Sequence, residues 1–130
     1  MNKPFSMAAR LRSFTFAFWG IMAMLRSQHN AWIHALATVV VCGGGFYVGL
    51  SAGEWCWIVL AVMAVWTAEA LNTAFEFLAD VASPNYHPLV GKAKDVAAGA
   101  VLISAIGAAV IGVLVFGPHL AEKFPNLGKM

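Results

Sequence analysis

Residues 64–80 read AVWTAEALNTAFEFLAD, an apolar stretch that carries acidic residues where a lipid-facing helix should have none. Glu69, Asn72, Glu76 and Asp80 lie at helical positions i, i+3, i+7 and i+11, so they share one polar face. A rise of about 1.5 Å per residue puts Glu69 about 10 Å from Glu76 and about 16 Å from Asp80 along the axis. Because ionisable residues at membrane depth are costly, this polar face predicts a functional site. The alternative is that the acids cap helices or pair with basic side chains.

The composition predicts a membrane protein. The chain has 130 residues, of which 61% are hydrophobic and 11% charged, against roughly 25% charged in soluble domains. Its mean hydropathy is +0.76, and a single soluble core of this size would not hide so much apolar surface. The net charge of +2 gives no indication of a nucleic-acid partner. We expect an all-α membrane protein with one domain, residues 1–130.

Four helices are predicted around the polar face. Residues 6–28 combine apolar residues at helical spacing with arginines, which is typical of a surface helix lying in the membrane interface. Residues 31–50, 55–79 and 96–116 are long and apolar enough to be transmembrane helices. The connector at 83–89 contains two prolines, and Pro118 is expected to end the last helix.

The distribution of Lys and Arg predicts the orientation of the chain. Six of these residues precede the first span or lie between the second and third spans, and two lie in the carboxyl-terminal tail. This difference places the amino terminus and the 83–95 region in the cytoplasm. The Asp80 end of the polar face would then lie on the cytoplasmic side, where nucleotides are present.

Acids near the interface, together with lysines in the sequence GKAKD at 91–95, suggest a site for a metal-bound phosphate group. Mg²⁺ is usually held by one or two carboxylates plus substrate phosphates, and lysines can neutralise phosphate charge. Glu69 lies deeper and is a plausible general base for a lipid hydroxyl. The residues therefore favour phosphoryl transfer from a nucleotide to a membrane alcohol. Ion or proton translocation by a small transporter stays open as an alternative.

Two motifs resemble those of the prokaryotic diacylglycerol kinase family, which includes undecaprenol kinases. The family pattern E-x-x-N-[ST]-A-x-E-x-x-x-D matches EALNTAFEFLAD at 69–80, and its Lys-Asp element matches KDVAAGAVL at 94–102. Upstream, SFTFAFWGI and NAWIH are also similar to family elements. The resemblance covers roughly residues 10–117. It implies a bacterial inner-membrane lipid kinase with MgATP as co-substrate, a surface helix, three transmembrane helices and a homotrimeric assembly with its active site at the cytoplasmic face.

The resemblance also implies roles for individual residues. Glu69 corresponds to the catalytic base and Glu76 to a metal ligand, while Asp80 corresponds to an active-site polar residue. The nucleotide contacts correspond to Asn72, Asn85, Tyr86, His87, Lys94 and Asp95, with an upstream basic residue at Arg10 or Arg12.

Two positions depart from the family pattern. Gln28 stands where the family has a second metal-binding Glu, so the metal site loses a charge and is expected to bind Mg²⁺ more weakly. Phe16 stands near the nucleotide where a Tyr is common. The alternative function is therefore a weak or inactive family member that binds lipid or nucleotide. His34 is expected to be a polar anchor, since its spacing from His29 suits no shared metal site.

Overall fold

The computed structural model describes residues 6–125, and α-helix is the only regular secondary structure within that range. Its four helices are α1 (Met7–Ser27), α2 (His29–Val48), α3 (Ala52–Ala82) and α4 (Pro88–Lys123). The last three are long and apolar enough to cross a membrane, whereas α1 is more amphipathic. The predicted fold class, an amphipathic helix followed by three apolar helices, is confirmed.

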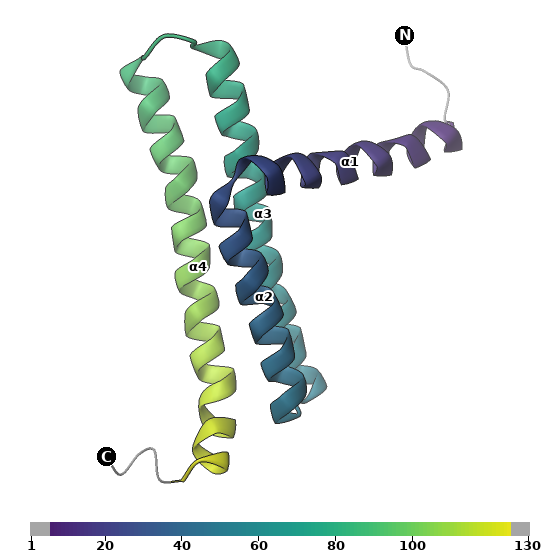
Figure 1. The fold of residues 1–130 in the computed structure, drawn as a ribbon, viewed down its shortest axis with the longest axis vertical. Coiled ribbons are helices and arrows are strands. Elements are labelled where there is room, and N and C mark those ends of the chain that lie inside the picture. The colour runs from purple at the N-terminus through teal and green to yellow at the C-terminus, as the bar shows by residue number, and fades with distance from the viewer. Residues whose placement is uncertain (1–5, 126–130) are drawn as a thin grey trace.

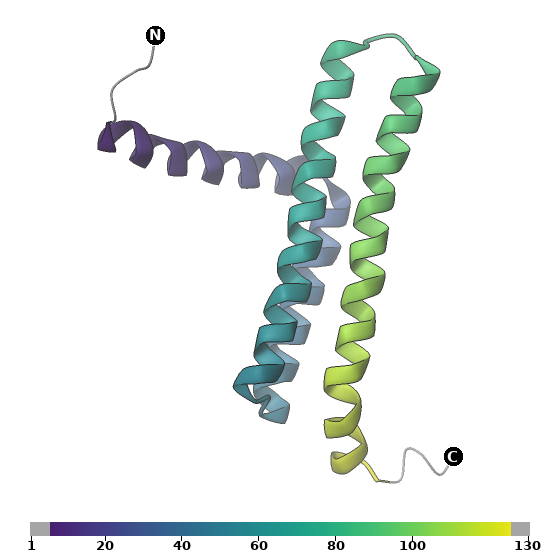
Figure 2. The same cartoon turned by 180° about the vertical axis from the view of Figure 1, so that it is seen from behind.

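The three apolar helices run side by side, and α1 projects sideways from them (Figure 1). α3 and α4 form an antiparallel hairpin with extensive contact, and α2 packs less extensively against both. The view from behind shows that α1 joins the bundle well short of the α3–α4 connector (Figure 2). The junction between α1 and α2 therefore lies beside the middle of α3, where the polar face begins.

Large apolar side chains cover the outside of the bundle. A small core forms where Leu50, Ile58 and Val115 pack together near the end opposite the connector. Most other large hydrophobic side chains of the described helices are exposed, including Trp32, Phe46 and Leu114. Such a surface is stable in lipid and not in water, which agrees with three membrane-spanning helices.

α3 begins three residues earlier than predicted, at Ala52 instead of residue 55. Ser51 and Glu54 form a capping box, in which the Ser51 hydroxyl accepts from the Glu54 N–H and the Glu54 carboxylate accepts from the Ser51 N–H. This reciprocal pair satisfies two backbone donors that would otherwise be unpaired. The sequence SAGE, predicted as a turn, therefore contains the helix start.

We expect Ser51→Ala to lower the free energy of unfolding by about 1 kcal/mol, the usual effect of losing a serine N-cap. The measurement is a denaturation curve of the purified protein in detergent micelles. Ser13→Ala is the matched control, because the Ser13 hydroxyl only donates to a carbonyl within α1. Equal effects of the two substitutions would contradict the capping argument.

α4 is much longer than the predicted span 96–116. It begins at Pro88, which is favoured in the first helical turn, and His87 Nδ1 accepts a hydrogen bond from the Leu89 N–H at 3.2 Å. Pro118 does not end the helix, which continues to Lys123. Two contacts hold its last turn: His119 Nε2 lies 2.8 Å from Glu54 Oε1, and Lys123 Nζ lies 3.7 Å from the centre of the Tyr47 ring.

The other boundaries differ by one to three residues. α1 spans 7–27 where 6–28 was predicted, because Ser6 is its N-cap and Gln28 ends it. α2 spans 29–48 where 31–50 was predicted, because Gly49 adopts the left-handed conformation that ends a helix. α3 continues to Ala82 where the prediction ended at 79, and the following Ser83 N–H still bonds to the Ala79 carbonyl.

Candidate active site

Glu76 is the centre of a polar cluster at the junction of α1 and α2 with α3. The Gln28 side-chain amide donates to Glu76 Oε2, and the Asn72 amide donates to Glu76 Oε1 at 3.1 Å. Gln28 is separated from Glu76 by 48 residues, so this contact is made only by the tertiary fold. Both carboxylate oxygens are thus held by amide donors, and the side chain is half-buried.

Glu69 lies two turns deeper along α3 and is 1% exposed. Neither of its carboxylate oxygens has a hydrogen-bond partner among the described residues. The nearest basic group is the His34 ring of α2, whose Nε2 lies 3.8 Å from Glu69 Oε2. Burying a carboxylate without a hydrogen bond is costly. This cost favours a functional role for Glu69, such as contact with a substrate, over a role in packing.

Glu69 and Glu76 line the same cavity, which has a volume of about 260 Å³. The cavity lies between α2, α3 and α4, and its polar lining residues are Asn30, His34, Glu69, Asn72 and Glu76. Asn72 Oδ1 is buried without a hydrogen-bond partner in the described structure, like the Glu69 oxygens. The residues that line the cavity therefore include three buried acceptor atoms without a hydrogen-bond partner, which suit a donor such as a hydroxyl group.

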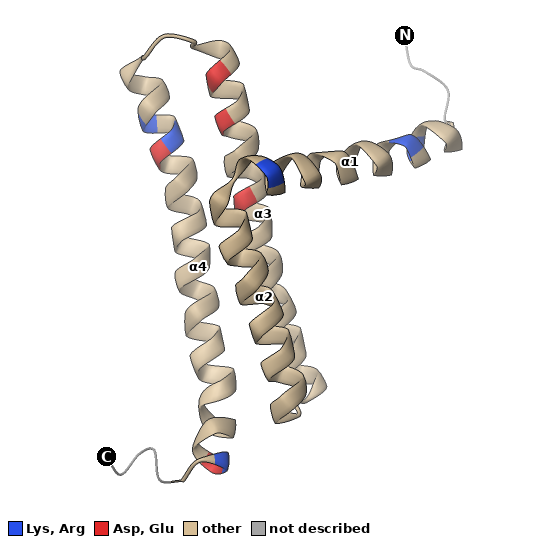
Figure 3. Cartoon of the chain, in the orientation of Figure 1, with Lys and Arg blue, Asp and Glu red and all other residues tan. Residues whose placement is uncertain are grey.

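Asp80 lies further along the same face of α3 and is exposed. Its Oδ1 accepts from Lys94 Nζ of α4 at 2.8 Å, which joins the two helices close to their connector. Asp95, next to Lys94, and nearby Lys92 are exposed. Charged residues gather at this end of the α3–α4 hairpin (Figure 3). The alternative that the acids are merely paired holds for Asp80, whereas Glu69 has only the 3.8 Å contact with His34 and no hydrogen bond among the described residues.

The other residues predicted for nucleotide binding are not brought into the cavity within one chain. Asn85, Tyr86 and His87 are exposed on the connector, where His87 caps α4. Arg10 and Phe16 lie on α1, which points away from the bundle (Figure 1). The single chain therefore unites the deep part of the predicted site and leaves these predicted nucleotide contacts outside the polar cavity.

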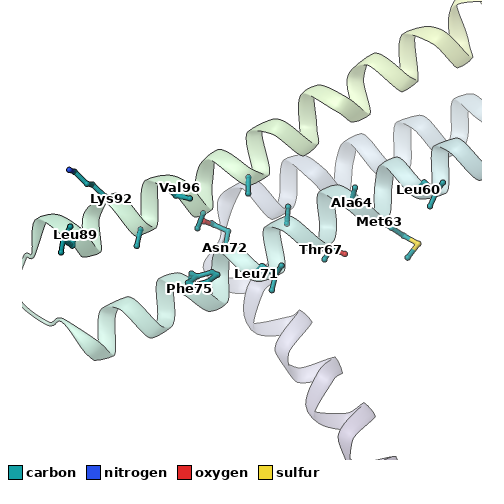
Figure 4. Close-up of a pocket in the computed structure, with 14 residues that line it drawn as sticks. Leu60, Met63, Ala64, Thr67, Leu71, Asn72, Phe75, Leu89, Lys92 and Val96 are labelled. Atoms are coloured by element: carbon teal, nitrogen blue, oxygen red, sulfur yellow. The ribbon is translucent and has the colours of Figure 1, made fainter.

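A separate apolar groove of about 940 Å³ runs between α3 and α4 (Figure 4). Its lining extends from Leu60 in the first half of α3 to Leu89 at the start of α4, and it shares Asn72 with the polar cavity. Thr67, Asn72 and Lys92 are its only polar lining residues within the described chain. The groove can contact apolar chains but has few groups suited to chemistry.

The donor atoms around Glu76 are suited to Mg²⁺ only in part. Among residues 6–125, no group of three or more His, Cys, Asp or Glu side chains is placed to hold a metal ion. Glu76 supplies one carboxylate, and Gln28 and Asn72 supply amide groups whose oxygens are acceptable ligands. This set fits Mg²⁺ where phosphate oxygens complete the coordination, as is common for nucleotide sites.

Sequence reasoning placed Glu69, Asn72 and Glu76 on one face correctly but gave His34 no place in the site. The sequence offers one signal for it, the position of a histidine six residues after Gln28 in an apolar run. Its contact with Glu69 depends on how α2 packs against α3. Helical periodicity describes one helix at a time and cannot predict such a contact.

Comparison with known proteins gives a consistent result. Residues 15–116 match the model of the family described as prokaryotic diacylglycerol kinase. The chain is 41% identical to undecaprenol kinase of Bacillus subtilis (strain 168) over 109 residues, which cover 84% of this chain and 89% of that one. It is 36% identical to a diacylglycerol kinase of Synechocystis over 85% of this chain and 63% of that one. Identity to Escherichia coli K12 diacylglycerol kinase is 33%, over 65% and 66% of the two chains.

Proposed function

Because this chain belongs to the prokaryotic diacylglycerol kinase family and is a lipid kinase, we propose that it transfers the γ-phosphoryl group of ATP to a membrane lipid hydroxyl. The observation that carries the proposal is Glu69, a fully buried carboxylate with two unpaired oxygens in a polar cavity inside an apolar helix bundle. Arg10 lies outside the matched residues 15–116, so its proposed part in nucleotide binding rests on the sequence resemblance alone.

Glu69 is proposed as the general base. Its depth in α3 suits a hydroxyl group that enters from the membrane, and its free oxygens can accept the hydroxyl proton as the oxygen attacks phosphorus. Asn72, one turn away, has an unpaired Oδ1 in the same cavity and is proposed to orient the reacting groups. These two residues would act from the same face of one rigid helix, which keeps their spacing fixed.

Glu76 is the proposed ligand of Mg²⁺, with Gln28 as a weaker second ligand after rotation of its amide to present oxygen. Bound Mg²⁺ would neutralise charge on the transferred phosphoryl group. Lys94 and Asp95, with Asp80 and the connector residues Asn85, Tyr86 and His87, are proposed to hold the nucleotide. All of them except the half-buried Lys94 are exposed at the end of the α3–α4 hairpin, which supports access from water.

The proposed acceptor is undecaprenol or diacylglycerol. The 41% identity to an undecaprenol kinase supports a long polyprenyl alcohol as the first candidate. The apolar groove between α3 and α4, which shares Asn72 with the cavity, supports an acceptor with an extended apolar chain.

We further propose a homotrimer in the bacterial inner membrane with the connector on the cytoplasmic side. The excess of Lys and Arg near the amino terminus and connector supports this orientation. The sideways projection of α1, which carries Arg10 and Phe16, supports an assembly in which α1 reaches a neighbouring subunit (Figure 2). The mass of the purified complex would test the trimer.

The assay that tests the function measures transfer of radiolabelled phosphate from MgATP by the purified protein in mixed micelles. Undecaprenol and diacylglycerol are offered separately and together. Phosphorylated product on either lipid would support the proposal and identify the preferred acceptor. Absence of product on both, at saturating Mg²⁺, would favour the second candidate, a family member that binds lipid or nucleotide without turnover.

The observation behind that second candidate is Gln28, whose amide nitrogen and not a carboxylate faces Glu76. We expect Gln28→Glu to lower the Mg²⁺ concentration for half-maximal activity several-fold, because a second carboxylate strengthens a Mg²⁺ site. A Mg²⁺ titration of lipid phosphorylation checks this. Ser27→Glu is the control, since it adds the same charge at an exposed neighbouring position. An unchanged Mg²⁺ requirement in Gln28→Glu would remove Gln28 from the metal site.

A further inference from the structure

His34 of α2 is the one titratable side chain of the polar cavity to which the proposed mechanism gives no role. Its ring is largely buried, with 15% of the side chain exposed, and its Nε2 lies 3.8 Å from Glu69 Oε2. In the described chain it is the only basic group within ion-pair distance of that carboxylate. This imidazole is therefore the one basic group of the described chain that is placed to orient the Glu69 side chain.

Hydrogen bonds join α2 to α3 close to His34. Trp66 Nε1 of α3 donates a hydrogen bond to Thr38 Oγ1 of α2 at 3.1 Å, and the Thr38 hydroxyl donates to the His34 carbonyl at 2.7 Å. Thr38 follows His34 by one helical turn, and Trp66 precedes Glu69 by about one turn. The two helices are thus joined immediately beside the His34–Glu69 contact, which holds the backbone of His34 next to that part of α3.

The Glu69 carboxylate needs such a constraint. It has no hydrogen-bond donor among the described residues, so nothing else defines which of its oxygens faces the cavity. Misplacing a reacting group by about 1 Å can reduce a rate about 100-fold. The distance of 3.8 Å is longer than a hydrogen bond, but such contacts are often long in unliganded enzymes and tighten when the substrate binds.

We propose that His34 is a positioning residue, whose imidazole holds Glu69 Oε2 so that Oε1 faces the lipid hydroxyl. This inference rests on the proposed kinase function and adds a residue to it. In the transfer step the hydroxyl proton passes to Glu69, the lipid oxygen forms a bond to the γ-phosphorus, and the bond from that phosphorus to ADP breaks. His34 orients the base throughout and exchanges no proton with the lipid.

The test compares His34→Leu, which removes the ring nitrogens, with His34→Gln, which keeps an amide donor near the position of Nε2. We expect His34→Leu to lower kcat about tenfold to a hundredfold with the KM for MgATP unchanged, since the geometry of the base and not nucleotide binding is affected. His34→Gln is expected to retain most of the wild-type kcat. The readout is initial-rate lipid phosphorylation in mixed micelles.

His29→Leu is the matched control, because it removes an exposed histidine of the same helix and leaves the His34 ring in place. It is expected to leave kcat unchanged. If His34→Leu has the wild-type kcat, or if His29→Leu loses kcat to the same extent, the positioning role is wrong while the kinase function stands. If the wild-type protein phosphorylates neither lipid, the proposed function itself fails, and the role of His34 fails with it.

A second measurement is independent of whether His34→Leu folds. The ¹⁵N magnetic resonance spectrum of the histidine side chains is recorded for wild-type protein and for Glu69→Gln. We expect the His34 signals to shift and those of His29, His87 and His119 to stay in place, since none of these three contacts Glu69 in the described structure. Unchanged His34 signals would overturn the inference.

Discussion

Glu69→Gln is expected to reduce the rate of lipid phosphorylation by about 10²–10⁴-fold, the usual contribution of a general base. The substitution keeps the size of the side chain but removes its capacity to accept the hydroxyl proton. The binding of MgATP should be unaffected, because Glu69 lies about 10 Å along the helix from Glu76. The measurement is kcat for phosphate transfer to the preferred lipid, with the KM for MgATP from the same data.

Glu54→Gln is the control for this result. Glu54 is an acid on the same helix, but it lies at the opposite end of the bundle, where it pairs with His119. It is expected to keep the wild-type kcat even if it weakens the start of α3. A Glu69→Gln enzyme with near wild-type kcat would mean that another group accepts the proton, and the proposed assignment of the base would be wrong.

Glu76→Gln is expected to lower kcat/KM for MgATP about a hundredfold, or about 3 kcal/mol of transition-state stabilisation. Glu76 supplies the only carboxylate in the cluster with Gln28 and Asn72. Its replacement by an amide leaves Mg²⁺ with neutral protein ligands alone. Raising the Mg²⁺ concentration should restore part of the activity, because the loss is one of metal affinity.

The response to Mg²⁺ separates the two acids. High Mg²⁺ is expected to rescue Glu76→Gln in part and Glu69→Gln not at all, because the base acts on the lipid proton and not on the metal. Both titrations are run in the same micelles with the same lipid. Equal rescue of both variants would contradict the proposal that Glu69 accepts the lipid proton and Glu76 binds the metal.

Much of the fold follows from local sequence patterns. Apolar runs of about twenty residues predict the membrane helices, and the mixed pattern before residue 28 predicts the amphipathic helix. The boundaries were less predictable, because contacts from other helices hold the turn after Pro118 and a capping box begins α3 at Ala52. In the sequence alone, Pro118 and the segment SAGE at 51–54 both look like breaks between helices. Only the contacts of the neighbouring residues show that both lie within or at the start of a helix.

The sequence by itself determined that this protein is a helical membrane protein, and that Glu69, Asn72, Glu76 and Asp80 share one face of a helix. These properties depend on composition and on a period of 3.6 residues, both of which are local. Tertiary structure alone decided how the three acids differ: Asp80 pairs with Lys94, Glu76 is held by Gln28, and Glu69 lies beside His34 without a hydrogen bond. Those contacts join different helices, and their geometry is set by how the helices pack, which no single helix encodes.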